Sequence, residues 1–324
     1  MPEFAHDFPF DPTYGLTRDA LLAVPAPPAP EGFDAFWRAR FEAAARVAPE
    51  PRLGALVAER AGVRVHEVSY GSVAGRCGGW LVLPEAGRPV RHGFVIGHGY
   101  GGREGVADAL PLPLPDAAAL LPCVTGMPGR SRRADVPEWP EEHVLHGIGS
   151  RETYVIGDCV ADLWCAATAL TELVPELVGR GLGYLGESLG GGLGALALPW
   201  DDRFRAARLT VPTFGNHPLR LTLPCAGSGE AVRRLHRTRP EIVEVLALHD
   251  AATAATRVRI PVLTAPALFD PVVPPPGQFA VHNALAGPRD LYVLTAGHFP
   301  HAGEATERRG LEQATTGFFG RWLG

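Results

Sequence analysis

Lysine is absent from this chain of 324 residues, so all 30 of its basic residues are arginine. The absence excludes the lysine of a phosphate-binding P-loop, a pyridoxal Schiff base and any lysine general base. Cysteine is scarce, and the cysteines that occur are widely spread and lack the C-x-x-C pairs typical of metal or redox sites. We interpret all of them as reduced core residues: Cys77, Cys123, Cys159, Cys165 and Cys225.

Long apolar runs and a surplus of positive charge are also missing. No apolar run approaches the roughly 18 residues that a membrane span requires, and the net charge of -5 provides no basic surface for nucleic acid. Residues 1–15 are acidic and aromatic, without the basic start and apolar block of a secretory signal. We expect a cytoplasmic protein whose partner is neither a membrane nor a nucleic acid.

The sequence offers no pattern for a metal ion or a cofactor. His143 and His146 lack the carboxylate and histidine neighbours of a metal motif. The glycines at positions 97, 99, 101 and 102 do not follow the G-x-G-x-x-G spacing, and no acidic residue follows a second strand at the distance that a dinucleotide site requires. We therefore expect neither a metal nor a cofactor.

The order of the predicted elements indicates one α/β domain. A hydrophobic content of 46% with 20% charged residues is ordinary for a globular chain of this length. Residues 1–31 show no helix or strand period and end in the proline-rich segment 25–30, which predicts an extended arm. We expect a single domain at 32–324, opening with an amphipathic helix near 33–41.

Strands and helices then alternate, which predicts a mostly parallel central sheet with helices on both faces. Its first two strands are expected to form an antiparallel hairpin. The predicted strands are 63–70, 77–83, 93–97, 119–125, 181–185, 206–211, 260–269 and 290–295. The predicted helices after the hairpin are 153–173, 189–199, 277–285 and 304–322. An arginine-rich, helical segment at about 214–255 interrupts this order, and we predict that it forms a cap over the strand ends.

The pentapeptide Gly186-Glu187-Ser188-Leu189-Gly190 lies between a predicted strand and a predicted helix. It matches the G-x-S-x-G nucleophile elbow, in which a serine stands on a sharp turn between these two elements. The glycines on either side lack side chains, which lets strand and helix approach closely. Glycine-rich turns without a nucleophile contain the same letters, so the assignment of Ser188 depends on a base and an acid elsewhere in the chain.

An acid and a base follow in the order that an elbow serine requires. Asp270 comes at the end of the strand predicted at 260–269, and His298 follows the strand predicted at 290–295. We expect Asp270 to orient His298, and His298 to take the proton of Ser188 and then protonate the leaving group. His301 competes for the base role, and His298 is preferred because it directly ends its strand.

Two backbone N–H groups are needed to bind the oxyanion of a tetrahedral intermediate. The amide of Leu189, the residue after the serine, is the expected first donor. The second donor is expected from the glycine-rich loop 98–102 that follows an early strand. We assign it to the amide of Tyr100, with the amides of its two neighbours as alternatives.

These residues together resemble the acetyl xylan esterase and cephalosporin C deacetylase group, carbohydrate esterase family seven of the α/β-hydrolases. The segments that carry the resemblance are Phe33–Trp37, Gly99–Gly102, Gly186–Gly192, Asp270 with Pro274 and Pro275, Ala286–Pro288, and Gly297 with His298. The resemblance implies an α/β-hydrolase fold and a serine esterase that removes acetyl groups from sugars or other small molecules. It implies Ser188, Asp270 and His298 as triad and the amides of Tyr100 and Leu189 as oxyanion hole. It also implies a homo-oligomer, commonly a hexamer.

Three positions depart from the pattern of that family. Leu189 stands where the family usually has glutamine, Phe299 stands where it usually has glutamate, and the segment 126–130 replaces an Arg-Gly-Gln turn. These changes keep the triad and predict a more apolar site. Two other functions therefore stay open: acyl transfer or amide hydrolysis on the same triad, and a catalytically inactive hydrolase fold used for binding.

Overall fold

The computed structural model describes residues 4–60 and 62–324, and within them a nine-stranded sheet has the order β1-β2-β3-β5-β4-β6-β7-β8-β9. The strands are β1 (Arg52–Arg60), β2 (Val63–Ser72), β3 (Gly75–Pro84), β4 (His92–Ile96), β5 (Ala117–Pro122), β6 (Leu182–Glu187), β7 (Phe204–Thr210), β8 (Val262–Ala265) and β9 (Arg289–Leu291). The pairs from β5 through β4 to β9 are parallel, and β1, β2, β3 and β5 pair antiparallel. The predicted hairpin and the predicted, mostly parallel sheet are confirmed.

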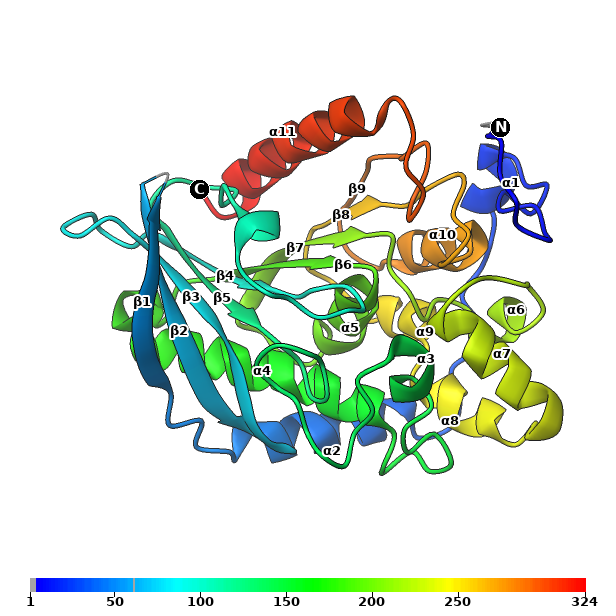
Figure 1. Ribbon diagram of the computed structural model, residues 1–324, viewed down its shortest axis with the longest axis horizontal. Helices are drawn as coiled ribbons and strands as arrows, with labels where there is room; N and C mark the ends of the chain where they lie inside the picture. Colours follow the sequence, from blue (N-terminus) through cyan, green and yellow to red (C-terminus); the bar gives the residue numbers. More distant parts are fainter. Residues whose placement is uncertain (1–3, 61) are drawn as a thin grey trace.

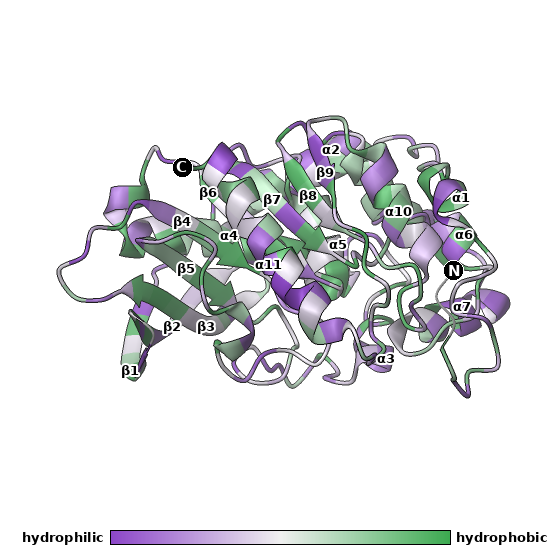
Figure 2. Ribbon diagram, turned by 90° about the horizontal axis from the view of Figure 1, so that it is seen from above, coloured by the Kyte–Doolittle hydropathy of each residue, from purple (hydrophilic) through white to green (hydrophobic). Residues whose placement is uncertain are grey.

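Helices cover both faces of the sheet (Figure 1). They are α1 (Arg18–Leu22), α2 (Phe33–Ala45), α3 (Pro140–His143), α4 (Val155–Leu173), α5 (Leu189–Ala197), α6 (His217–Arg220), α7 (Ser228–Thr238), α8 (Ile242–Leu248), α9 (Ala251–Ala255), α10 (Pro275–Ala284) and α11 (Glu304–Trp322). Helix α11 lies on one face, and α2, α4 and α5 lie on the other (Figure 1). Each face has its own hydrophobic cluster, and the strands between are apolar, whereas α11 carries hydrophilic residues along its length (Figure 2).

The strand order reverses beside β4. The chain passes from β4 to its neighbour β5 and then crosses back to β6 on the other side of β4. The loops that leave the carboxyl ends of β4 and β6 therefore turn in opposite directions, and a crevice forms between them. This reversal brings the loop 98–102 and the turn at Ser188 to the same edge of the sheet, where parallel-sheet proteins bind ligands.

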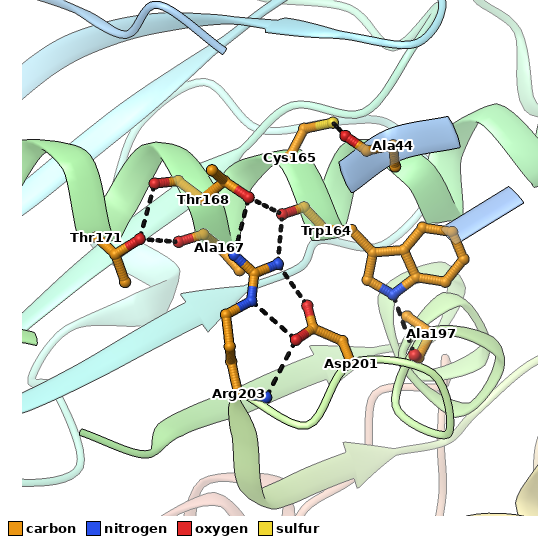
Figure 3. Close-up of polar contacts among 9 residues, drawn as sticks. All are labelled: Ala44, Trp164, Cys165, Ala167, Thr168, Thr171, Ala197, Asp201 and Arg203. Atoms are coloured by element: carbon orange, nitrogen blue, oxygen red, sulfur yellow. Dashed lines mark hydrogen bonds and ion pairs between the residues drawn. The ribbon is translucent and has the colours of Figure 1, made fainter. Parts of the chain in front are cut away.

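Hydrogen bonds from Arg203 fasten the turn between α5 and β7 to α4 (Figure 3). Its guanidinium donates to both carboxylate oxygens of the buried Asp201 at 2.8 and 2.6 Å, to Thr168 Oγ1 at 2.8 Å and to the carbonyl of Trp164 at 3.0 Å. The indole of Trp164 in turn donates to the carbonyl of Ala197 at 3.1 Å (Figure 3). The helix that begins after Ser188 is thus fixed at its far end.

The N-terminal segment and strand β1 differ from the sequence-based predictions, and the predicted cap segment is helical. The predicted extended arm contains α1, whose first turn is capped by the Thr17 hydroxyl accepting from the Ala20 amide at 3.3 Å. Strand β1 was not predicted, and its residues are exposed on both faces, so it lacks the alternation that identifies a half-buried strand. Within the segment predicted to be a cap, the structure has α6, α7, α8 and α9, and Figure 1 shows α6 to α8 beyond the ends of β6 and β7.

Candidate active site

The backbone turns sharply at Ser188, between β6 and α5. Ser188 has φ 54° and ψ -112°, a conformation that L-residues rarely adopt and that a nucleophile elbow requires. A side chain at Gly186 would meet the carbonyl oxygen of Gly190 at 2.3 Å, and one at Gly190 would meet the backbone of Gly97 at 2.9 Å. The two glycines are therefore needed for strand, helix and the loop after β4 to meet at the serine.

The three residues predicted as a triad lie within hydrogen-bond distance of each other. His298 Nε2 is 2.9 Å from Ser188 Oγ, and His298 Nδ1 is 2.8 Å from Asp270 Oδ2. Because a carboxylate only accepts hydrogen bonds, the imidazole proton belongs on Nδ1, and Nε2 is free to accept the proton of the serine hydroxyl. The alternative base, His301, instead has its Nε2 3.3 Å from Glu307 Oε2.

A fully buried carboxylate at Asp270 is held by four donors. Its Oδ1 accepts from the amides of Val272 and Val273, both at 2.9 Å. Its Oδ2 accepts from the side-chain amide of Gln278 at 2.9 Å as well as from His298. Gln278 is itself fully buried and was not predicted, since nothing in its spacing from Asp270 distinguishes it from an ordinary helix residue. These donors fix the carboxylate that orients the imidazole.

Opposing influences set the pKa of His298. Burial lowers it, while the charge and hydrogen bond of Asp270 and the charge of Glu187 raise it, and the resulting pKa lies above the usual 6.5. The His298 side chain keeps 24% of its surface exposed, whereas the side chain of Asp270 has none. An imidazole in this setting is a stronger base than a free histidine and remains accessible to a substrate.

The predicted oxyanion donors belong to the start of α5 and to the loop after β4. Leu189 is the first residue of α5, so its amide has no acceptor within the helix. On the other side, a Cβ added to Gly99 would lie 3.7 Å from the Cβ of Ser188, which places the loop after β4 against the serine. The Tyr100 hydroxyl lies 3.4 Å from His143 Nδ1, so the side chain is engaged with α3 rather than with the triad.

The buried side chain of His98 fixes the peptide group that carries the Tyr100 amide. Val124 N donates to His98 Nε2 at 3.1 Å, which leaves the proton on Nδ1, and Nδ1 lies 2.7 Å from the carbonyl oxygen of Gly99. Burial lowers the pKa of His98 to about 4, so the ring is neutral near pH 7. Since the C=O and N–H of a trans peptide point in opposite directions, the Tyr100 N–H is held away from this ring.

Aromatic side chains from the N-terminal segment pack on the two loops that carry the acid and the base. The ring of Phe4 lies 4.9 Å from that of Phe269 and 5.4 Å from that of Phe299, and Phe8 lies 6.2 Å from Phe299. Phe269 directly precedes Asp270, and Phe299 directly follows His298. The amide of Asp270 also donates to the carbonyl of Pro12 at 3.2 Å. The N-terminal segment thus supports both triad loops.

The departures from the family pattern lie in different surroundings. The side chains of Leu189 and Met127 are fully buried in the hydrophobic core, so they present no accessible surface to a ligand. Phe299 belongs to the aromatic group just described and also lines a cavity of about 470 Å³ beneath α11. Of the three departures, Phe299 is the one that adds apolar surface beside His298.

Neither a metal centre nor a membrane span is found in the described residues. Within residues 4–60 and 62–324, no group of three or more His, Cys, Asp or Glu side chains is placed to hold a metal ion. Within the same ranges, no helix combines the length and the apolar character needed to cross a bilayer.

The chain is similar to known enzymes in both sequence and fold. A family model described as acetyl xylan esterase (AXE1) matches residues 23–311. Acetyl xylan esterase 1 from Thermoanaerobacterium sp. JW/SL YS485 superposes with a TM-score of 0.80 at 20% identity, covering 94% of this chain and 99% of that chain. The acetyl xylan esterase from Paenibacillus sp. R4 superposes with a TM-score of 0.77 at 21% identity, covering 94% of this chain and 100% of that chain. An acylaminoacyl peptidase from Pyrococcus horikoshii superposes with a TM-score of 0.63 at 17% identity, covering 82% of this chain and 42% of that chain. The structural likeness confirms the predicted α/β-hydrolase fold.

Proposed function

Because the chain belongs to the acetyl xylan esterase family, we propose that it is a serine esterase that hydrolyses short acyl esters, in particular acetyl esters of sugars or other small alcohols. One observation carries the proposal. Ser188 Oγ lies 2.9 Å from His298 Nε2, and His298 Nδ1 lies 2.8 Å from the buried Asp270. This arrangement is that of an activated nucleophile, a general base and the acid that orients the base.

The reaction proceeds in two halves on this geometry. His298 takes the proton of Ser188 as Oγ attacks the ester carbonyl, and Asp270 stabilises the imidazolium that forms. His298 then gives this proton to the alcohol oxygen, the carbon–oxygen bond of the ester breaks, and the acyl group remains on Ser188. A water molecule, deprotonated by His298, attacks the acyl-serine, and the acid is released as Oγ recovers its proton.

The amides of Leu189 and Tyr100 bind the negative oxygen of each tetrahedral intermediate. A donor of this kind contributes about 3 kcal/mol to the stability of the transition state. Both amides lie on backbone that other contacts fix. Gly190 N donates to the carbonyl of His98 at 2.9 Å, which ties the start of α5 to the loop after β4. The two donors are thereby held in place before a substrate arrives.

Replacement of the nucleophile tests the proposal directly. The wild-type protein is expected to release p-nitrophenol from p-nitrophenyl acetate and to be labelled by a fluorophosphonate, and Ser188→Ala is expected to do neither. Ser150→Ala is the matched control, because Ser150 lies outside the triad and its hydroxyl hydrogen-bonds with Glu152. Hydrolysis and labelling that persist in Ser188→Ala would contradict the assignment.

The acetyl preference and the assembly are separate parts of the proposal. Rates on acetyl, butyryl and octanoyl esters of one sugar test the first, and we expect the acetyl ester to give the highest kcat/KM. We also propose that the chain forms a homo-oligomer. Size-exclusion chromatography with light scattering at micromolar concentration tests this, and a monomer mass there would contradict it.

A further inference from the structure

A cavity of about 470 Å³ lies between α11 and the sheet and begins at His298. Strands β6 and β7 contribute Glu187, Arg208 and Thr210 to its floor, and α11 contributes Glu312 and Thr315 to its roof. This volume is within the range of small-molecule sites. In the proposed reaction, His298 protonates the leaving alcohol, so the alcohol half of the ester must lie next to this imidazole. The cavity is therefore adjacent to the position of that half.

Arg208 lies on the floor of this cavity and forms no ion pair with a carboxylate among the described residues. Its Nη1 donates to Thr315 Oγ1 at 3.3 Å, while its Nε is buried without a hydrogen-bond partner, and the same holds for Thr210 Oγ1. In the part of the chain that the structure describes, no carboxylate oxygen lies within 4.0 Å of the guanidinium. Burial lowers the pKa of Arg208, while the charges of Glu187 and Glu312 raise it, and arginine stays charged at neutral pH. A half-buried guanidinium whose Nε lacks an acceptor is costly, which points to a ligand that supplies one.

We propose that the cavity beneath α11 binds the alcohol half of the ester and that Arg208 binds a carboxylate carried by that half. The inference rests on the proposed esterase function. A guanidinium presents parallel N–H donors that match the two oxygens of a carboxylate. The hydroxyl of Thr210, two residues along the same strand face, is a further donor to the same group.

Five carboxylates and a second arginine also line the cavity and decide which alcohols fit best: Asp108, Glu187, Glu304, Glu307, Glu312 and Arg308. Glu187 and Glu312 both line the cavity and are exposed to solvent, so they stand nearer its mouth than the buried Nε of Arg208. They oppose the entry of a purely anionic ligand and favour one that also carries a positive charge. The expected order of preference is an amino-acid alcohol first, a simple carboxylated alcohol second and a neutral alcohol last.

Three acetyl esters of equal chain length test the proposal. Butyl acetate is neutral, 4-acetoxybutanoate carries a carboxylate, and O-acetyl-L-homoserine carries both a carboxylate and an ammonium. The measurement is kcat/KM from acetate release by wild type, Arg208→Met and Arg208→Lys. Arg205→Met is the matched control, since Arg205 is the second residue of the same strand, is exposed and lies against Gly181, outside the cavity.

We expect the wild type to prefer both carboxylated esters over butyl acetate by on the order of tenfold, the effect of one charged hydrogen-bond pair. Arg208→Met should lose this preference, Arg208→Lys should keep part of it, and Arg205→Met should keep all of it. A wild type without the preference, or an Arg208→Met that retains it, overturns the proposal.

A second measurement needs no variant at position 208. In wild type, 4-hydroxybutanoate should inhibit the hydrolysis of p-nitrophenyl acetate at concentrations about tenfold lower than butan-1-ol does, for the same electrostatic reason. Equal inhibition by the two alcohols overturns the proposal even if Arg208→Met fails to fold. Failure of the esterase proposal itself is distinguishable, because then p-nitrophenyl acetate is not hydrolysed in a Ser188-dependent manner at all.

Discussion

Gln278 should control the basicity of His298 through Asp270, and Gln278→Met tests this. The side-chain amide donates to Asp270 Oδ2 at 2.9 Å and to the carbonyl of Val273 at 2.6 Å, and its oxygen accepts from the Ala267 amide at 2.7 Å. Methionine fills a similar volume without these bonds. A lost hydrogen bond to a charged group and two unsatisfied backbone groups together cost roughly 3–5 kcal/mol of unfolding free energy.

The pH dependence separates positioning from mere stability. With one hydrogen-bond donor fewer, the negative charge of Asp270 is less stabilised by its other neighbours and attracts the imidazolium form of His298 more strongly. The pKa of His298 should therefore rise further above 6.5. His298 acts as a base only when neutral, and the acid limb of kcat/KM should therefore move to higher pH by about one unit, equivalent to about 1.4 kcal/mol. We expect kcat to fall on the order of tenfold or more, because the carboxylate is less well oriented.

Asn283→Leu provides the matched control. Asn283 lies on the same helix, and its amide donates to the carbonyls of Leu21 and Val24 at 3.0 and 2.9 Å, far from the triad. Its loss should lower the unfolding free energy by about 1–3 kcal/mol without moving the pH profile. Urea unfolding and pH–rate profiles with p-nitrophenyl acetate measure both properties. An acid limb of Gln278→Met that coincides with that of wild type and Asn283→Leu would refute the reasoning.

Two further predictions concern the surroundings of the triad. Phe299→Ala removes a ring that packs on Phe4, Phe8 and Phe269. It should lower kcat several-fold and the unfolding free energy by about 1–3 kcal/mol, and Phe299→Leu should restore most of both; unchanged kinetics in the alanine variant would show that this packing does not position His298. The second concerns acid stability, since burial lowers the pKa of His98 to about 4 in the folded protein, whereas the unfolded chain titrates near 6.5. As the pH falls through this window the unfolded state binds the proton first, so the protonation of His98 should lower the unfolding free energy of the protein by about 2 kcal/mol between pH 7 and pH 5. Urea unfolding at the two pH values checks this, and the loss should be smaller in His98→Asn than in wild type.

The order of elements and the convergence of the triad could be predicted because their signals are local. The glycines around Ser188 mark a turn that only residues without side chains allow, and the strands before Asp270 and His298 are short apolar runs. A parallel sheet then brings the ends of its strands to one edge. The chain order of the three residues, together with this rule, predicts that they lie close together at that edge, and the structure has them within hydrogen-bond distance.

Residues whose role depends on tertiary contacts could not be predicted. Gln278 reads as an ordinary helix residue, and its three hydrogen bonds exist only once α10 packs beside the end of β8. Arg208 reads as a polar residue in a short strand, and only the described structure shows that its buried Nε lacks an acceptor beneath α11. The role of His98 likewise depends on Val124, a residue from the next strand connection. Sequence spacing carries no information about such pairings.

The contact between Pro12 and Asp270 also constrains the order in which the site is completed. The N-terminal segment leaves the ribosome before the loops that it packs on, which lie more than two hundred residues later, as does the Pro224 carbonyl that accepts from the Tyr14 hydroxyl. It can therefore dock fully only after the chain has been synthesised past Phe299.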